Sequence, residues 1–286
     1  MKYENCQLCP RRCCVDRTAG KTGFCGCPGE ALVAKTMLHK WEEPILAGEG
    51  GSGAIFFAGC TLKCAYCQNA AISRTPAGTV MDSVRLRREM EDLIARGAEN
   101  IDLVTPTQYL PTVIGALQEK LPVPVVYNCG GYERLEAIRL LSGLVDIYLP
   151  DLKYADPALA ASLSAAPDYF YHATRAIREM VRQVGATVFS ETGKLLKGVV
   201  IRHLILPGQV ENSLKVLDWI GETFAPGQVL VSLMRQYTPM PGMKPPLDRQ
   251  VTEEEYQAVL SWMYLNELEG FTQESASASQ SFIPDF

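Results

Sequence analysis

Three cysteines at short spacing, Cys60, Cys64 and Cys67, stand directly after the strand-like run 54–57. Thiolates of this kind hold iron–sulfur clusters. Three of them would occupy three corners of a cubane and leave the fourth iron without a protein ligand. An open coordination position is also what separates catalytic from structural zinc sites. The alternatives are zinc, a disulfide and bare thiols, but a zinc site usually requires a fourth ligand that this loop does not supply.

With Tyr66 before its last cysteine, the loop resembles the cluster loop of the radical S-adenosylmethionine (SAM) superfamily. Its continuation Gln68-Asn69 resembles the branch related to pyruvate formate-lyase activating enzyme. The resemblance implies a 4Fe–4S cluster whose open iron chelates SAM. It also implies reductive cleavage to a 5'-deoxyadenosyl radical, which takes a hydrogen atom from a substrate. The cofactor carries that chemistry, and the protein supplies position and excludes water. A low-potential electron donor, flavodoxin or ferredoxin, is the expected partner.

Six further cysteines lie within the first 27 residues, among prolines and glycines that interrupt helices and strands. A loop-rich segment this short has no core of its own, and a bound metal would stabilise it. The spacing therefore predicts a second metal site, either another iron–sulfur cluster or a tetrahedral zinc. Its expected ligands are Cys6, Cys9, Cys13 and Cys25. Cys14 and Cys27 are then spare or alternative ligands.

The composition is that of an ordinary globular protein of 286 residues, with 47% hydrophobic and 21% charged residues. A net charge of −5 favours neither nucleic acid nor an anionic membrane as a partner, so a small molecule or a protein is the expected substrate. No apolar run approaches the roughly 20 residues that span a bilayer. The first residues do not form a secretory signal. We therefore expect a cytoplasmic protein whose cysteines bind metal rather than form disulfides.

Strands and helices alternate after the cysteine loop, which predicts parallel strands with right-handed crossovers. The expected strands are 54–57, 100–104, 123–127, 145–149, 198–206 and 229–233. The expected helices are 84–95, 109–120, 133–141, 157–163, 174–184, 213–223 and 252–269. Patterning alone does not separate an open sheet from a barrel. The resemblance implies the fold class: α/β, a partial (β/α)6 radical SAM barrel with a small N-terminal Cys-rich metal-binding extension.

This interpretation divides the chain into three parts. Residues 1–48 are the expected Cys-rich head and linker, 49–270 the barrel, and 271–286 a flexible C-terminal tail with a low-complexity run. His39, in the linker, is either a ligand or proton donor or a residue that holds the linker by a hydrogen bond. Cys129 stands apart from the other cysteines, where packing is the more usual role.

Polar residues follow the expected strands at the end where parallel barrels collect their chemistry. Side chains alternate along a strand, so Arg202 and His203 face opposite ways. The resemblance places Arg202 inside, paired with the SAM carboxylate, because a buried arginine needs an anion. It implies further cofactor contacts from Tyr66, Thr105, Thr107 and Asn128. The alternative for Thr107 is a helix N-cap.

A spacing of two puts Asp151 and Lys153 on one face. Their segment Asp-Leu-Lys resembles one that lines the substrate side of SAM in glycyl radical activases, which implies that they are the catalytic pair. An exposed surface ion pair is the alternative. Gln236 and Tyr237 are expected on the substrate side. The function predicted first is hydrogen abstraction by a radical SAM enzyme of the activase-like branch, with the glycine of a glycyl radical enzyme as one target. The alternatives are a small-molecule or peptide substrate, and a non-catalytic iron–sulfur redox protein.

Overall fold

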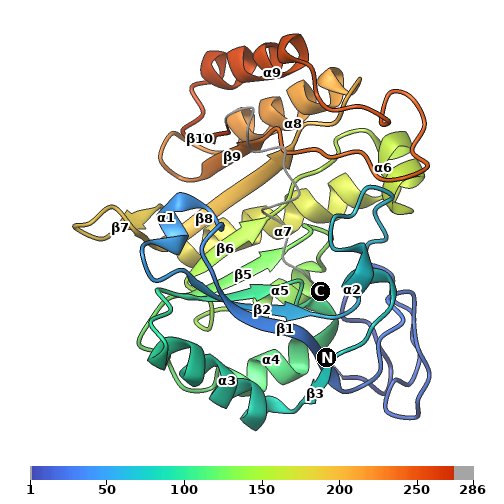
Figure 1. Ribbon diagram of the computed structural model, residues 1–286, viewed down its shortest axis with the longest axis vertical. Coiled ribbons are helices and arrows are strands. Elements are labelled where there is room, and N and C mark those ends of the chain that lie inside the picture. The colour runs from blue at the N-terminus through green and yellow to red at the C-terminus, as the bar shows by residue number, and fades with distance from the viewer. Residues whose placement is uncertain (1, 274–286) are drawn as a thin grey trace.

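In the computed structural model, residues 2–273 are described, and they form one twisted sheet flanked by helices (Figure 1). Six parallel strands follow one another across the sheet in chain order. They are β2 (Ser52–Phe57), β4 (Ile101–Val104), β5 (Val125–Cys129), β6 (Ile147–Pro150), β8 (Leu195–Leu204) and β9 (Leu230–Met234). These are the six strands that the sequence predicts, so the (β/α)6 order is confirmed.

Four shorter or peripheral strands extend this sheet. They are β1 (Ala31–His39), β3 (Thr79–Met81), β7 (Val188–Phe189) and β10 (Gly270–Thr272). β1 runs antiparallel to β2, with Val33 paired to Phe57 and His39 to Ser52. Much of the segment expected as a linker is therefore a strand of the barrel sheet itself. β10 adds a parallel strand beyond β9.

The helices within residues 2–273 are α1 (Pro44–Ala47), α2 (Ala70–Arg74), α3 (Ser83–Ala95), η1 (Thr107–Tyr109), α4 (Leu110–Ala116), α5 (Leu135–Arg139), α6 (Pro157–Ser164), α7 (Tyr169–Val184), α8 (Val210–Thr223) and α9 (Glu253–Leu265). The longer helices cover the outer face of the sheet (Figure 1), whereas α1 packs against its inner face. The last helix begins at a capping box of Thr252 and Glu255. It ends four residues early because the chain turns at Glu267, φ 52°, to enter β10.

The inside of the barrel is apolar at the amino ends of the strands. There Leu46 of α1 packs with Val126, Leu149, Val200 and Leu230. Polar side chains occupy the same strand faces further along, which places them toward the carboxyl ends. The apolar layer therefore closes one end of the interior and leaves the polar end for a site.

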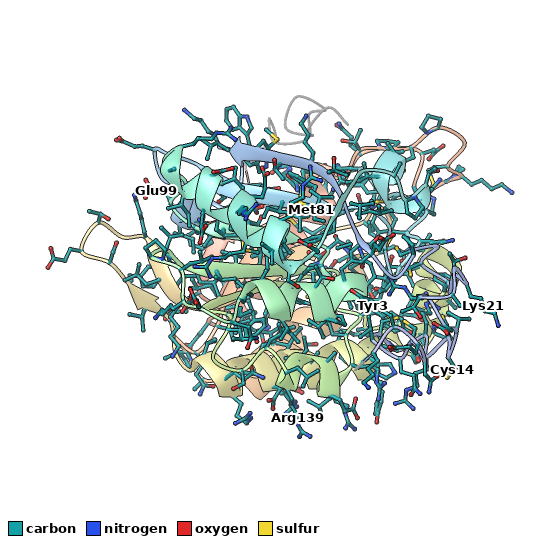
Figure 2. All side chains as sticks on the ribbon, turned by 90° about the horizontal axis from the view of Figure 1, so that it is seen from below. Tyr3, Cys14, Lys21, Met81, Glu99 and Arg139 are labelled. Carbon is teal, nitrogen blue, oxygen red and sulfur yellow. The ribbon has the colours of Figure 1, made fainter. Side chains whose placement is uncertain are left out.

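The head, defined in the structure as residues 2–30, has no helix or strand. It lies beside α2, on the side of the molecule opposite α1 and β7 (Figure 1). In Figure 2, Cys14 and Lys21 lie at the outer rim of the head, while Glu99 marks the other end of the molecule. Within residues 2–273, no helix has the length and apolar character needed to cross a membrane.

His203 lies on the outer side of β8, opposite to Arg202 as strand alternation predicts. Its Nδ1 donates to the carbonyl oxygen of Leu152 at 2.7 Å, which leaves Nε2 to accept from the Ser213 hydroxyl of α8 at 2.9 Å. Burial lowers the pKa of His203 to about 4. The side chain is a neutral structural group, fully hydrogen-bonded between sheet and helix.

This histidine should make the fold less stable in mild acid. Its folded pKa is about 4 and its ordinary value 6.5, so between these values the unfolded chain binds more protons. The contribution of neutral His203 to the free energy of unfolding is fully present above pH 6.5. It falls as the pH drops toward 4, by roughly 2 kcal/mol between pH 7 and pH 5. Urea unfolding at pH 7 and at pH 5 measures this effect. The free energy of unfolding should fall more between the two pH values for the wild type than for His203→Gln. Equal losses would contradict the assignment.

Candidate iron–sulfur and cofactor site

A cavity of about 280 Å³ lies at the carboxyl ends of the parallel strands, and Cys60, Cys64 and Cys67 line it. The cysteine loop follows β2, which is buried along its whole length. Gln108 fixes the entry to the loop, because its side-chain amide donates to the carbonyl oxygens of Ala58 and Gly59 at 3.1 and 3.0 Å. A second hollow, of about 340 Å³ between α3 and α4, has none of the expected site residues in its lining.

Each thiol of the loop meets a hydrogen-bonding group. The Leu62 N–H points at Cys60 Sγ (3.4 Å), the Ser164 hydroxyl at Cys64 Sγ (3.1 Å), and the Ser73 hydroxyl lies 3.4 Å from Cys67 Sγ. Burial raises the pKa of Cys60 and of Cys64, so these thiols need a compensating metal charge to ionise. Thiols that line one cavity and have donors in place fit a cluster bound by three cysteines.

A buried ionic network occupies the cavity wall beside the cysteines. Arg202 donates from Nε to Asp151 Oδ1 at 2.9 Å and from Nη2 to Asn128 Oδ1 at 2.6 Å, and Lys153 Nζ donates to Asp151 Oδ2 at 2.5 Å. The side chains of Asp151 and Lys153 are only 13% and 15% exposed, which excludes the surface ion pair. Burial raises the pKa of Asp151, but Arg202 and Lys153 outweigh it and bring that pKa below its usual value.

Two glutamates that the sequence interpretation did not single out complete this network. Glu42 Oε1 lies 3.6 Å from Arg202 Nη1, and Glu43 Oε1 accepts from the Ser232 hydroxyl at 2.7 Å. Burial and Glu42 raise the pKa of Asp102 well above its usual value, which favours its protonated form. Arg202 therefore already has anions from the chain. The pairing of Arg202 with the SAM carboxylate stays a prediction. The burial of Arg202 is not evidence for that pairing, because carboxylates of the chain already balance its charge.

Tyr66 and Thr105 line the cavity as expected. The Tyr66 hydroxyl lies 2.6 Å from the Tyr154 hydroxyl, which fixes the ring against the barrel. Thr105 has φ +59°, an unusual conformation for a β-branched residue, at the end of β4. Such backbone strain clusters at ligand sites because the surrounding fold maintains it.

Of the remaining expected residues, Asn128 and Gln236 line the cavity and Thr107 and Tyr237 are absent from its lining. The Thr107 hydroxyl donates to buried Glu133 at 2.5 Å, so it neither faces the cavity nor acts as an N-cap. The Tyr237 hydroxyl donates to the carbonyl oxygen of Leu247 at 2.6 Å, and its ring centroid lies 6.0 Å from that of Tyr66. Their contacts with cofactor or substrate remain predictions.

His39 and Cys129, for which the sequence left the role open, also line the cavity. His39 is buried, and its Nδ1 has no hydrogen-bond partner among residues 2–273. His39 therefore makes no hydrogen bond through Nδ1, and its role, as ligand, proton donor or hydrogen-bonded support of the linker, stays a prediction. Cys129, at the end of β5, is buried, and burial raises its pKa well above the usual value.

The head brings several thiols together. Burial raises the pKa of Cys9 to about 12, and the nearby charges of Cys25 and Cys13 contribute to that rise. The Phe24 N–H points at Cys13 Sγ at 3.3 Å, and buried Arg17 places Nη1 3.7 Å from Cys6 Sγ. Thiols with N–H donors aimed at them fit a thiolate-bound metal group. Among residues 2–273, no three His, Cys, Asp or Glu side chains surround a position for one metal ion.

The two spare cysteines of the head have different environments. Cys27 is buried against the cluster loop, where its Sγ lies 3.6 Å from the carbonyl oxygen of Ala58. Its hydrogen bond to Cys25 lowers the pKa of Cys25 to about 6. Cys14 is exposed at the rim of the head (Figure 2). Of the two, Cys27 is the one placed to join the thiols of the head.

A family model described as a 4Fe-4S single cluster domain matches residues 46–106, which include the three-cysteine loop. The match bears out the expected 4Fe–4S cluster in this part of the chain. One curated relative is 29% identical over 270 residues, which cover 90% of this chain and 74% of the relative. It is a protein of Methanocaldococcus jannaschii described as "Uncharacterized protein MJ0674".

Solved structures of other proteins share the fold. A radical SAM methyltransferase from Sphaerobacter thermophilus has a TM-score of 0.53 at 15% identity, over 78% of this chain and 66% of its own. Streptococcus suis SuiB bound to S-adenosylmethionine has a TM-score of 0.51 at 15% identity, over 76% of this chain and 48% of its own. This chain thus matches about half to two thirds of each structure. The radical SAM fold expected from the cysteine loop is confirmed, and the activase-like branch is not tested by these structures.

Proposed function

We propose that this protein is a radical SAM enzyme that works at the cavity described above. A 4Fe–4S cluster held by Cys60, Cys64 and Cys67 would bind SAM and supply the electron that cleaves it to methionine and a 5'-deoxyadenosyl radical. The observation that carries the proposal is that three thiols, each beside a hydrogen-bonding group, line one cavity. That cavity lies at the carboxyl ends of the parallel strands, in a radical SAM fold.

The chain's own residues then provide a charged site. Lys153 holds a positive charge near Cys64, because Asp151 and Cys64 outweigh the effect of burial and raise its pKa. Asp151 and Asn128 are oriented by Arg202, which bonds to both. Phe56, Leu204 and Met234 add apolar surface to the same lining, and apolar walls keep water from a reactive radical.

The substrate has two candidate classes. Activation of a glycyl radical enzyme is the first, on the strength of the Gln68-Asn69 continuation of the cluster loop. Modification of a small molecule or peptide is the second. A flavodoxin or ferredoxin would supply the electron, because reduction of the cluster requires a donor of low reduction potential. A non-catalytic redox protein is disfavoured because an electron carrier normally has four protein ligands to its cluster.

Anaerobic reconstitution followed by dithionite and SAM tests the activity. We expect 5'-deoxyadenosine and methionine in equal amounts, and an electron paramagnetic resonance (EPR) signal of the reduced cluster that changes when SAM is added. An intact cluster that ignores SAM and yields no 5'-deoxyadenosine would favour the redox-protein alternative.

For the head, we propose a second metal group bound by Cys6, Cys9, Cys13 and Cys25, with iron–sulfur and zinc as the two alternatives. Metal analysis of a Cys60→Ala/Cys64→Ala/Cys67→Ala variant isolates this site. Iron with sulfide, or zinc, should remain bound in that variant. Loss of both metals would contradict the second site.

A further inference from the structure

A chain of hydroxyl groups ends on one of the cluster-loop cysteines. The Tyr66 and Tyr154 hydroxyls are 2.6 Å apart, Tyr154 lies 2.7 Å from the Ser164 hydroxyl, and Ser164 donates to Cys64 Sγ at 3.1 Å. Ser164 is fully buried and is the last residue of α6, 100 residues from Cys64. Because each hydroxyl can donate to the next, the chain polarises in one direction and strengthens its last bond.

The end of α6 is held in place by an arginine of the head. Arg11 donates from Nη2 to the carbonyl oxygen of Ser164 at 3.0 Å and from Nη1 to that of Ala165. These are carbonyls that a helix end leaves without intrahelical partners. The same guanidinium donates from Nε to the carbonyl oxygen of Thr61, in the cysteine loop, at 3.1 Å. Arg11 thus connects the head to both sides of the Ser164–Cys64 contact.

Arg11 also lies among the proposed ligands of the head. It stands between Cys9 and Cys13 in the sequence, and its backbone N–H interacts with the Cys9 thiol. Its guanidinium carbon lies 3.8 Å from the ring centroid of Phe24, which precedes Cys25. A metal group bound by these cysteines would fix the backbone on both sides of Arg11 and the ring beneath it.

We propose that loading of the head raises the reduction potential of the cluster on the three-cysteine loop, through Arg11 and the hydrogen bond from Ser164 to Cys64. This inference rests on the proposed function. Hydrogen bonds to cluster sulfurs stabilise the reduced, more negative state. With the head empty, α6 is released, the bond weakens, and the single electron from a low-potential flavodoxin or ferredoxin enters less readily. The head is then a regulator of cluster reduction.

Potentials measured by EPR-monitored redox titration test the hydrogen bond. Ser164→Ala should shift the midpoint potential downward. Ser162→Ala, on an exposed turn of the same helix, should leave it unchanged. If Ser164→Ala fails to hold iron, Tyr154→Phe should give a smaller downward shift by removing the previous donor. An unchanged potential in the variant that holds iron would overturn the inference. A wild type without a SAM-responsive cluster would instead count against the proposed function.

Arg11 and the head are tested in the same titration. Arg11→Ala should lower the potential, the exposed neighbour change Arg12→Ala should not, and Arg11→Ala/Ser164→Ala should lower it no further than Ser164→Ala alone. Additive shifts in the double variant would mean that Arg11 acts by another route. Cys9→Ala, with the loss of head metal verified by metal analysis, should produce the Arg11→Ala shift. An unchanged potential in that metal-depleted protein would overturn the regulatory role.

Discussion

Cys64→Ala will bind far less iron on the cysteine loop and will form no 5'-deoxyadenosine above background. Two remaining thiolates cannot hold a cubane that needs three protein ligands and an open iron. The change removes no large side chain, so the fold should persist, as circular dichroism can verify. Iron content and product formation, measured after identical anaerobic reconstitution, report the two losses separately.

Cys14→Ala is the matched control for that experiment. Its thiol is exposed and donates to the carbonyl oxygen of Arg12, two residues away at the rim of the head. The control should keep both the cluster and product formation. Full activity in Cys64→Ala would mean that the cavity cysteines do not hold the reactive group, and the proposed function would fail with them.

Arg202→Met will destabilise the fold by about 3–5 kcal/mol, because removing one member of a buried ionic network leaves its partners uncompensated. The partners are Asp151 at 2.9 Å and Glu42 at 3.6 Å, whose side chains are 13% and 11% exposed. Urea unfolding at pH 7 measures the loss. The apoprotein should be used, so that metal binding does not enter the comparison.

Arg87→Met provides the surface counterpart. Arg87 pairs with Glu91 at 2.7 Å on α3, where the arginine and glutamate side chains are 20% and 53% exposed, and Arg87 also donates to the carbonyl oxygen of Glu119. We expect a loss of about 1–2 kcal/mol, from one partly exposed ion pair and one hydrogen bond. Similar losses in the two variants would show that the Arg202 network is not energetically distinct from a surface pair.

Much of the fold follows from local patterns in the sequence. Each parallel strand is a short apolar run between helical segments, and that signal placed all six. Alternation along β8 correctly put Arg202 and His203 on opposite faces, because side-chain direction has a period of two residues in any strand. The resemblance to radical SAM proteins, not the alternation, placed Arg202 inside. The cysteine loop was recognisable because cluster ligation depends on spacing within eight residues.

The parts that the sequence did not predict depend on distant partners. Glu43 bonds to Ser232, 189 residues away, and Ser164 to Cys64, 100 residues away. No local period reports such contacts. The resemblance implied a cofactor contact from Thr107, but its hydroxyl donates to Glu133, 26 residues away, and Thr107 is absent from the cavity lining. Of the tail expected over 271–286, Phe271 and Thr272 belong to β10, and the part from 274 onward lies outside the described residues.

The position of β1 decides where this chain can be shortened. Starting the protein at Glu49 would strip an edge from the sheet, expose the backbone of β2 to unwanted pairing, and take Glu42 and Glu43 from their partners. A working truncation must therefore begin before Ala31. The shortest chain that keeps the sheet intact therefore includes the segment between the head and α1. A chimaera that carries the head of another protein should be joined at residue 30 rather than at residue 48.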